Sequence, residues 1–209
     1  MTEAVMFHDV IHTIDELRAI IGHPSQVVID KVQPELDEFS REFIAHSPFL
    51  LIGTSDAQGN ADVSPKGDPP GFVQVLDDHT LLIPDRPGNK RLDTLVNILE
   101  NPQIGMIFLI PGKRETLRVN GRAQLVRDSA LRERCAVNGK TPQILIAVTV
   151  EEVYFHCAKC VLRSGLWEAG KAQQELASLA EVIIGQTHIV ANADELQREV
   201  DEGDVATLY

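Results

Sequence analysis

Apolar and polar residues alternate along most of the chain between residues 48 and 156, and this pattern predicts β-strands. Turn residues separate the runs, as in Asp56–Asn60 and in Gly67–Gly71, where Pro and Gly would interrupt a hydrogen-bonded ladder. The expected strands are Phe49–Thr54, Ala61–Lys66, Phe72–Leu76, Thr80–Pro84, Ile104–Ile110, Thr116–Val126 and Ile144–His156. Strands at this spacing, with few helices between them, indicate a closed or partly closed antiparallel barrel of six or seven strands.

Helical spacing of apolar residues is found before, within and after this region. Isoleucine and leucine residues between positions 14 and 21 recur every three or four residues, and the pattern resumes after His23-Pro24. An apolar stripe that begins at Leu92 ends before Asn101-Pro102. Further helices are expected over 128–137, 172–183 and 193–200.

These elements predict an α+β chain that is mainly β and has three parts. An N-terminal helical extension over residues 1–47 would pack on the barrel. The barrel itself would occupy residues 48–170, and a helical C-terminal tail would follow over residues 171–209.

Composition and charge exclude several classes of partner. The 209 residues are 44% hydrophobic and carry a net charge of −12, which opposes general affinity for nucleic acid or anionic membrane. No apolar run approaches the ~20 residues of a membrane helix. Residues 1–9 lack the features of a secretory signal, and three cysteines make no disulfide framework. We therefore expect a cytoplasmic protein.

The basic stretch Pro84–Arg91, between a predicted strand and a predicted helix, is the main candidate for chemistry. A helix start presents unpaired backbone N–H groups and the positive end of its dipole. Gly88 would allow a ligand close to the backbone, and Arg86, Lys90 and Arg91 add positive charge. This combination is typical of a phosphate site, while a solvated basic turn remains the alternative.

Two other groups of polar residues lie on predicted strands. Arg118 alternates with apolar neighbours, so its face of the strand would either line a groove or meet water. Ser64 and Lys66 precede a Pro/Gly break and could point into a pocket, although strand ends often carry such residues for the turn alone.

His156–Cys160 contains a C-x2-C spacing beside a histidine. A structural zinc site needs four ligands, and the sequence offers no second motif to complete it. We expect no metal and interpret Cys157 and Cys160 as buried, inert thiols. There are two alternatives: a redox pair of Cys157 and Cys160, or a small metalloprotein built on His156 and these two cysteines.

Taken together, the motifs resemble a known family, the pyridoxamine 5′-phosphate oxidase-like flavin-binding split barrels. The resemblance covers Phe49 to Trp167, and its last motif is similar to that of a bacterial branch of the superfamily. The motifs that carry it are Ser64–Phe72, Ile83–Arg91, Asn101-Pro102, Leu117–Gly121 and His156–Trp167.

The resemblance implies a six-stranded split barrel that forms a homodimer and binds FMN in clefts between the subunits. Lys90 and Arg91 would hold the FMN phosphate, with Asn89 beside it. The remaining residues would contact the flavin ring and the ribityl chain. Among them, Arg163 and Trp167 would reach the cofactor from the other subunit. The full set implied is Asp62, Val63, Ser64, Pro65, Lys66, Ile83, Pro84, Asn89, Lys90, Arg91, Thr116, Arg118, Arg163 and Trp167.

The resulting hypothesis is an FMN-dependent oxidoreductase that acts on a small molecule. A flavin supplies the redox chemistry itself, which explains why no catalytic acid or base stands out. The alternatives are a flavin-binding carrier or sensor without turnover, and a barrel that uses deazaflavin F420 or haem. The stretch Asp204–Tyr209 lacks the arginines with which the true oxidase holds pyridoxal phosphate, and this counts against vitamin B6 oxidation.

Overall fold

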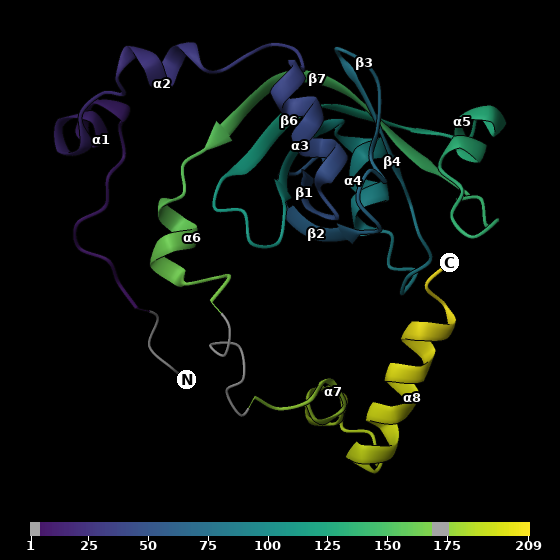
Figure 1. Cartoon of the computed structure of the whole chain (residues 1–209). Helices are drawn as coiled ribbons and strands as arrows, with labels where there is room; N and C mark the ends of the chain where they lie inside the picture. The colour runs from purple at the N-terminus through teal and green to yellow at the C-terminus, as the bar shows by residue number, and fades with distance from the viewer. Residues whose placement is uncertain (1–4, 169–175) are drawn as a thin grey trace. The chain divides into compact units, whose positions relative to one another are not determined.

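An antiparallel sheet of seven strands organises Gln33–Tyr209, the larger of the two units into which the chain divides (Figure 1). The computed structural model describes residues 5–168 and 176–209. The strands lie side by side in the order β2-β1-β5-β6-β7-β4-β3. Their bounds are β1 Phe49–Ser55, β2 Ala61–Gly67, β3 Gln74–Asp77, β4 Thr80–Pro84, β5 Gln103–Leu109, β6 Thr116–Val126 and β7 Leu145–His156.

The seven strands exceed the six that the resemblance implies, and the sheet is not closed. The seventh is β3, a strand of four residues that folds back on β4 as a hairpin with a register shift between Val75 and Asp77. Within the described part of the chain, β2 pairs with β1 alone and β3 with β4 alone. The mainly β, antiparallel class is thus confirmed, whereas the six-stranded count is wrong.

Alternate residues of the strands build the core on one face of the sheet, as the period of two requires. Leu50 and Ile52 of β1 are fully buried, and so are Leu117 and Val119 of β6. The helix that follows β4 contributes Ile98 to the same core.

A β-bulge in β7 depends on a glycine of the facing strand β6. The register with β7 shifts between Asn120 and Gly121, where the extra residue of β7 is accommodated. A Cβ at Gly121 would overlap the backbone carbonyl oxygen of Thr149, so a side chain cannot be placed there without moving the strand. At Gly105 an added Cβ would meet only the Asn120 side chain, at 3.3 Å.

The helices connect the strands or flank them. Within Gln33–Tyr209 they are α3 Glu38–His46, α4 Asp93–Glu100, α5 Ser129–Arg134, α6 Lys159–Ser164, α7 Leu179–Thr187 and α8 Ala193–Ala206. The predicted helix at 92–99 is thus confirmed as α4, and Asn192 caps α8 as its spacing with Glu195 suggests. The portion of the expected 172–183 helix that falls on 172–175 lies outside the described residues.

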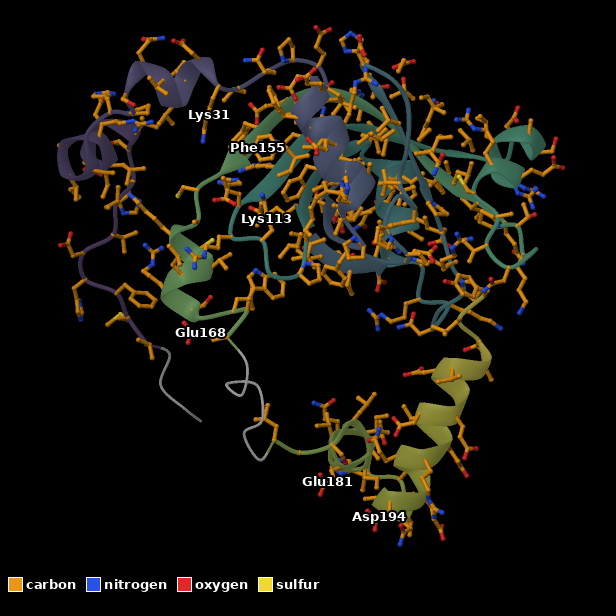
Figure 2. All side chains as sticks on the ribbon, viewed as in Figure 1. Lys31, Lys113, Phe155, Glu168, Glu181 and Asp194 are labelled. Atoms are coloured by element: carbon orange, nitrogen blue, oxygen red, sulfur yellow. The ribbon has the colours of Figure 1, made fainter. Side chains whose placement is uncertain are left out.

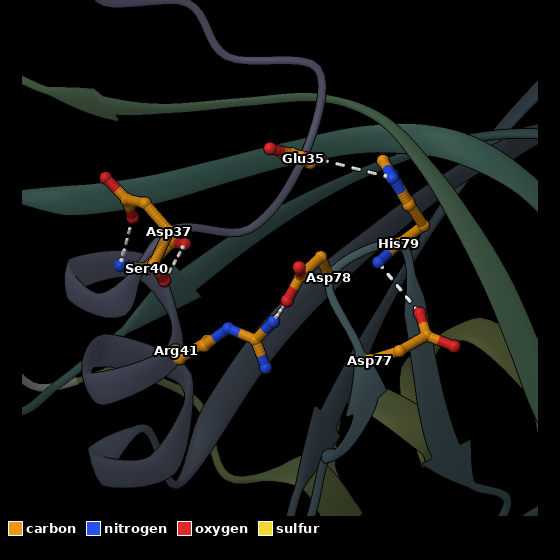
Figure 3. A network of polar contacts seen from close by, with 7 residues as sticks. All are labelled: Glu35, Asp37, Ser40, Arg41, Asp77, Asp78 and His79. Atoms are coloured by element: carbon orange, nitrogen blue, oxygen red, sulfur yellow. Dashed lines mark hydrogen bonds and ion pairs between the residues drawn. The ribbon is translucent and has the colours of Figure 1, made fainter.

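Polar contacts tie α3 to the β3–β4 hairpin (Figure 3). Asp37 caps α3 by accepting a hydrogen bond from the Ser40 amide at 2.8 Å. Arg41 forms an ion pair with Asp78 in the hairpin turn. The ring of His79 lies 3.2 Å from a Glu35 carboxylate oxygen. These contacts hold the chain around α3 against the β3–β4 hairpin.

The other unit, Met1–Val32, contains α1 Ile14–Ile21 and α2 Gln26–Asp30. Thr13 and Glu16 form a capping box at the start of α1. Neither helix has a buried residue, and Ile14, for example, is 75% exposed. None of the helices in the described ranges is both long and apolar enough to cross a membrane.

Candidate functional site

A cleft of about 230 Å³ lies between β2 and the loop that joins β4 to α4. Alternation along β2 places Asp62, Ser64 and Lys66 on one half-buried face, with Val63 exposed on the other. The opposite wall comes from the 85–92 loop and the first turn of α4. The lining residues are Asp62, Val63, Ser64, Pro65, Lys66, Asp85, Arg86, Gly88, Asn89, Lys90, Arg91, Leu92, Asp93, Thr94 and Leu95.

The carboxylates of the cleft are each engaged by a neighbour. Lys66 Nζ lies 3.4 Å from Asp85 Oδ1, and Thr94 Oγ1 donates to Asp62 Oδ2 at 3.3 Å. Arg91 Nε lies 2.7 Å from Asp93 Oδ2, and this contact raises the pKa of the Arg91 guanidinium.

Lys90 lies in the same wall of the cleft, and no described carboxylate lies within ion-pair distance of it. The cleft therefore keeps one cation available for a ligand.

The backbone of the 85–92 loop adopts an unusual conformation. Lys90 and Leu92 have φ values of 63° and 65°, in the left-handed region that residues with a Cβ rarely occupy. Leu92 is the N-cap of α4, and no side chain caps the helix there. The first turn of α4 lines the cleft, so the N-terminal end of the helix adds partial positive charge there, together with Lys90.

Arg86 belongs to the same loop and lines the cleft, yet its side chain is held by groups outside the loop. Its Nε donates to Asp68 Oδ2 at 2.6 Å, and its Nη2 donates to the backbone carbonyl of Cys135 at 2.9 Å. The Tyr209 hydroxyl donates to the other oxygen of Asp68 at 2.7 Å. This hydrogen bond is the main cause that raises the pKa of the Tyr209 phenol. Arg86 thus joins a buried polar cluster.

The structure brings together two of the predicted groups from different parts of the sequence. Asp62 to Lys66 and Asn89 to Arg91 line the cleft from opposite sides. Pro84 lies in an adjoining hollow of about 380 Å³ that shares Ser64 and Lys66 with the cleft. Ile83 is 0% exposed and packs in the core, so its side chain does not reach the cleft.

The other predicted residues lie elsewhere, on β6 and around α6, and none of them lines the cleft. Thr116 is buried opposite His156. The Arg118 guanidinium lies 5.7 Å from the centre of the Tyr154 ring and donates to Asn120 at 3.2 Å. Arg163 is in α6.

Trp167 follows α6 and contacts the loop between β5 and β6. Its Nε1 donates to the Lys113 carbonyl at 2.6 Å. A separate hollow of about 410 Å³ lies beside Lys113 and Phe155, which Figure 2 labels at the same end of the sheet. Phe43 and Phe155 meet there edge to face, with ring centres 5.5 Å apart. The lining of this hollow includes none of the predicted site residues.

The interpretation of the cysteines needs correction. Cys157 and Cys160 are exposed, because they lie where β7 leaves the sheet, whereas Cys135 is the buried thiol. Burial raises the pKa of Cys135. In the described ranges, no three His, Cys, Asp or Glu side chains are grouped as a metal site would require.

Two polar residues of α4 belong to the cleft and were not anticipated as site residues from the sequence. Thr94 bonds to Asp62, and Asp93 pairs with Arg91. Their position in the first turn after a basic loop is a signal that could have identified them, because first-turn side chains share the ligand side with the helix amides. The arrangement as a whole suits a small anion such as a phosphate group.

Comparison with known proteins gives a family for the part of the chain that contains the sheet. A family model described as pyridoxamine 5′-phosphate oxidase matches residues 36–157. No curated protein matches the chain in sequence.

Several solved structures are similar to parts of the chain. HupZ of Group A Streptococcus is 20% identical, with 56% of this chain and 91% of that one covered and a TM-score of 0.46. General stress protein 26 of Bacillus anthracis is 15% identical, with 55% and 88% covered and a TM-score of 0.43. An F420 reductase is 18% identical, with 58% and 98% covered and a TM-score of 0.41. Similarities at this level assign no ligand and no activity.

Proposed function

Because the chain belongs to the pyridoxamine 5′-phosphate oxidase family, we propose that it binds FMN in the cleft between β2 and the 85–92 loop. The observation that carries this proposal is the position of Lys90. It lies beside the uncapped start of α4 and has no described carboxylate partner. A phosphate there would receive both a full charge and backbone amides.

The donor set of the cleft fits FMN. Lys90 and Arg91 would hold the phosphate, with Asn89 beside it, since all three are on the loop that leads into α4. Ser64 and Lys66 on the facing strand offer a hydroxyl and an amine to the ribityl chain. The acidic residues nearby oppose the phosphate less than their number suggests, because each is engaged by a cation or a hydroxyl.

We further propose that the protein acts as a homodimer. Arg163 and Trp167 would contribute to the cofactor site of the other subunit, because within one chain they lie away from the cleft. Thr116 and Arg118 on β6 would meet the flavin ring in that assembly, because within one chain they also lie away from the cleft. The expected assembly is a dimer that binds two FMN molecules.

The activity proposed is that of an FMN-dependent oxidoreductase. Bound FMN would accept or donate a hydride, and the protein would supply binding and orientation. Lys90, Arg91 and the α4 amides would anchor the phosphate, while β2 would hold the cofactor along its length. The substrate would be a small organic molecule that reaches the exposed side of the cofactor.

Titration of the purified protein with FMN and with riboflavin tests the cofactor. We expect flavin absorbance in the purified protein and tighter binding of FMN than of riboflavin, because the phosphate site recognises FMN alone. A protein that takes up neither flavin would disprove the proposal. A Soret band would show that the cofactor is haem, and the spectrum of a deazaflavin would show that it is F420.

Activity is tested separately on the FMN-loaded protein. Reduction by NADPH or NADH and reoxidation by oxygen or an organic acceptor are followed at the flavin absorption maximum. We expect turnover. If the bound FMN is neither reduced nor reoxidised, the result would support a carrier or sensor instead.

A further inference from the structure

We infer that Arg86 is a positioning residue, which acts through Asp68 to hold the 85–92 loop in the shape that presents Lys90 to a phosphate. The inference rests on the proposed FMN site and deepens it. Arg86 would therefore not be a phosphate ligand, although its place in a basic loop suggests that role.

The contacts of Arg86 carry this inference. Its Nε bonds to Asp68 at 2.6 Å and its Nη2 to the Cys135 carbonyl at 2.9 Å, so two of the three guanidinium nitrogens are used by the protein itself. The Arg86 side chain is 14% exposed and that of Asp68 only 1%. A buried pair with this geometry is held firmly, because separating it would leave a charge without compensation.

The loop needs such an anchor. Residues 87–91 are all exposed, and Lys90 and Leu92 have positive φ, a conformation that residues with a Cβ do not favour. The Arg91 amide donates to Asn89 Oδ1, but this contact lies within the loop and does not attach it to the sheet. The described attachments at its start are the Asp85 amide on Ile144, the Lys66–Asp85 pair and Arg86 itself. Arg86 is the most buried of these side-chain attachments and directly precedes the exposed residues.

Asp68 connects the anchor to a third segment. One carboxylate oxygen receives Arg86 and the other receives the Tyr209 hydroxyl, while the guanidinium lies 5.4 Å from the Tyr209 ring centre. Both carboxylate oxygens are therefore occupied, and the Arg86 side chain is enclosed between Asp68 and Tyr209. In this arrangement it cannot reach a phosphate with Nε or Nη2 without breaking its contacts with Asp68 or with the Cys135 carbonyl.

Asp68→Asn distinguishes a positioning role from direct phosphate binding, because the two roles predict opposite results. The variant keeps the shape of Asp68 but removes the charge that holds Arg86. If Arg86 binds phosphate, the freed cation should tighten FMN binding. If Arg86 positions the loop, FMN binding should weaken by about tenfold or more, as for loss of a charge-assisted contact.

Riboflavin supplies the readout that a merely structural role would not change. It lacks the phosphate, so its Kd should stay within about twofold of wild type in Asp68→Asn and in Arg86→Lys. Arg86→Lys keeps the charge but cannot bond to Asp68 and to the Cys135 carbonyl together, and we expect it to weaken FMN binding as well. Asp78→Asn, which removes an Arg–Asp pair on the β3–β4 turn, is the matched control and should leave both Kd values unchanged.

Both Kd values are measured by flavin fluorescence on the full-length protein, with apo-protein melting as a check of folding. Selective loss of FMN affinity in Asp68→Asn and Arg86→Lys supports the inference. Unchanged or tighter FMN binding in Asp68→Asn would overturn it, and so would an equal loss for riboflavin. A wild-type protein that does not prefer FMN to riboflavin would overturn the proposed phosphate site as well.

Discussion

Lys66 and Asp85 form an ion pair, 3.4 Å between Nζ and Oδ1, that links two strands which do not pair in the sheet. Lys66 is in β2, at one end of the strand order, and Asp85 directly follows β4, next to the other end. Side-chain contacts thus connect the two walls of the cleft where no backbone ladder does. Asp68, which directly follows β2, and Arg86, which follows Asp85, form a second ion pair between the same two segments. Here the acidic residue is on the β2 side and the basic residue is on the β4 side.

The Lys66–Asp85 pair should contribute to stability. Both side chains are about four-fifths buried, being 20% and 22% exposed. We expect Lys66→Met and Asp85→Asn each to lower the free energy of unfolding by about 1 kcal/mol, with a coupling of about 0.5–1 kcal/mol in the double-mutant cycle. Urea denaturation of the four proteins measures this. Strictly additive losses would show that the two residues do not interact.

Replacing the cations of the loop should weaken FMN binding without affecting riboflavin. Lys90→Ala together with Arg91→Ala removes charge-assisted contacts that contribute about 1.5–3 kcal/mol each. Isothermal titration of FMN measures the loss. Arg122→Ala, an exposed cation on β6, is the control and should bind as wild type does. An unaltered Kd in the double variant would mean that the phosphate lies elsewhere.

Gly121→Ala should be severely destabilising, because its Cβ would overlap the Thr149 carbonyl in the middle of the β6–β7 ladder. Overpacking against backbone costs about 1–3 kcal/mol or more. Gly105→Ala is the matched variant, since its Cβ meets a side chain that can move. Thermal melting of both should show the larger drop for Gly121→Ala. Equal drops would refute the role given to the bulge.

The Tyr209 phenol should titrate above its ordinary pKa of about 10. Its hydrogen bond to Asp68 favours the protonated form, and the pKa is raised. A raised pKa in the folded protein means that the stabilising contact is complete below pH 10 and is lost as the pH rises through the folded value. The absorbance difference at 295 nm between wild type and Tyr209→Phe isolates this phenol. Titration at or below pH 10 would contradict the contact, and Asp68→Asn should lower the midpoint.

The three thiols should differ in reactivity. Cys157 and Cys160 are exposed, whereas Cys135 is buried and its pKa is raised. Since the thiolate is the reactive form, a thiol reagent at pH 8 should modify two cysteines in the folded protein and the third only after unfolding. Mass spectrometry identifies the sites. Modification of Cys135 at the rate of the other two would show that it is accessible.

The strands could be predicted because their signals are local. Alternation and flanking turn residues gave Thr116–Val126 with the bounds of β6, and Ala61–Lys66 within one residue of β2. The N-terminal region shows the limit of the same reasoning. Val32 continues the helical spacing in the sequence, but Gln33 bridges to Val153 and the chain is not helical there. At that point the contact with β7, which is distant in sequence, overrides the helical spacing of the apolar residues.

The candidate site was predictable to the extent that its parts are adjacent in sequence. Asn89 to Arg91 form one motif, and a phosphate interpretation follows from the motif alone. The role of Arg86 could not be predicted, because its partner Asp68 is 18 residues away and the carbonyl it contacts is 49 residues away. The sequence also did not show which thiols are buried: Cys160 was expected to be buried and is exposed.

Among the described residues β2 pairs with β1 alone, and this edge of the sheet has a consequence for how the protein behaves at high concentration. An unpaired strand edge can recruit a strand from another molecule and start aggregation. Pro65, the fifth of the seven residues of β2, has no amide hydrogen to offer, and the charged Lys66 follows it. The same segment that forms one wall of the cleft therefore also discourages growth of the sheet from chain to chain.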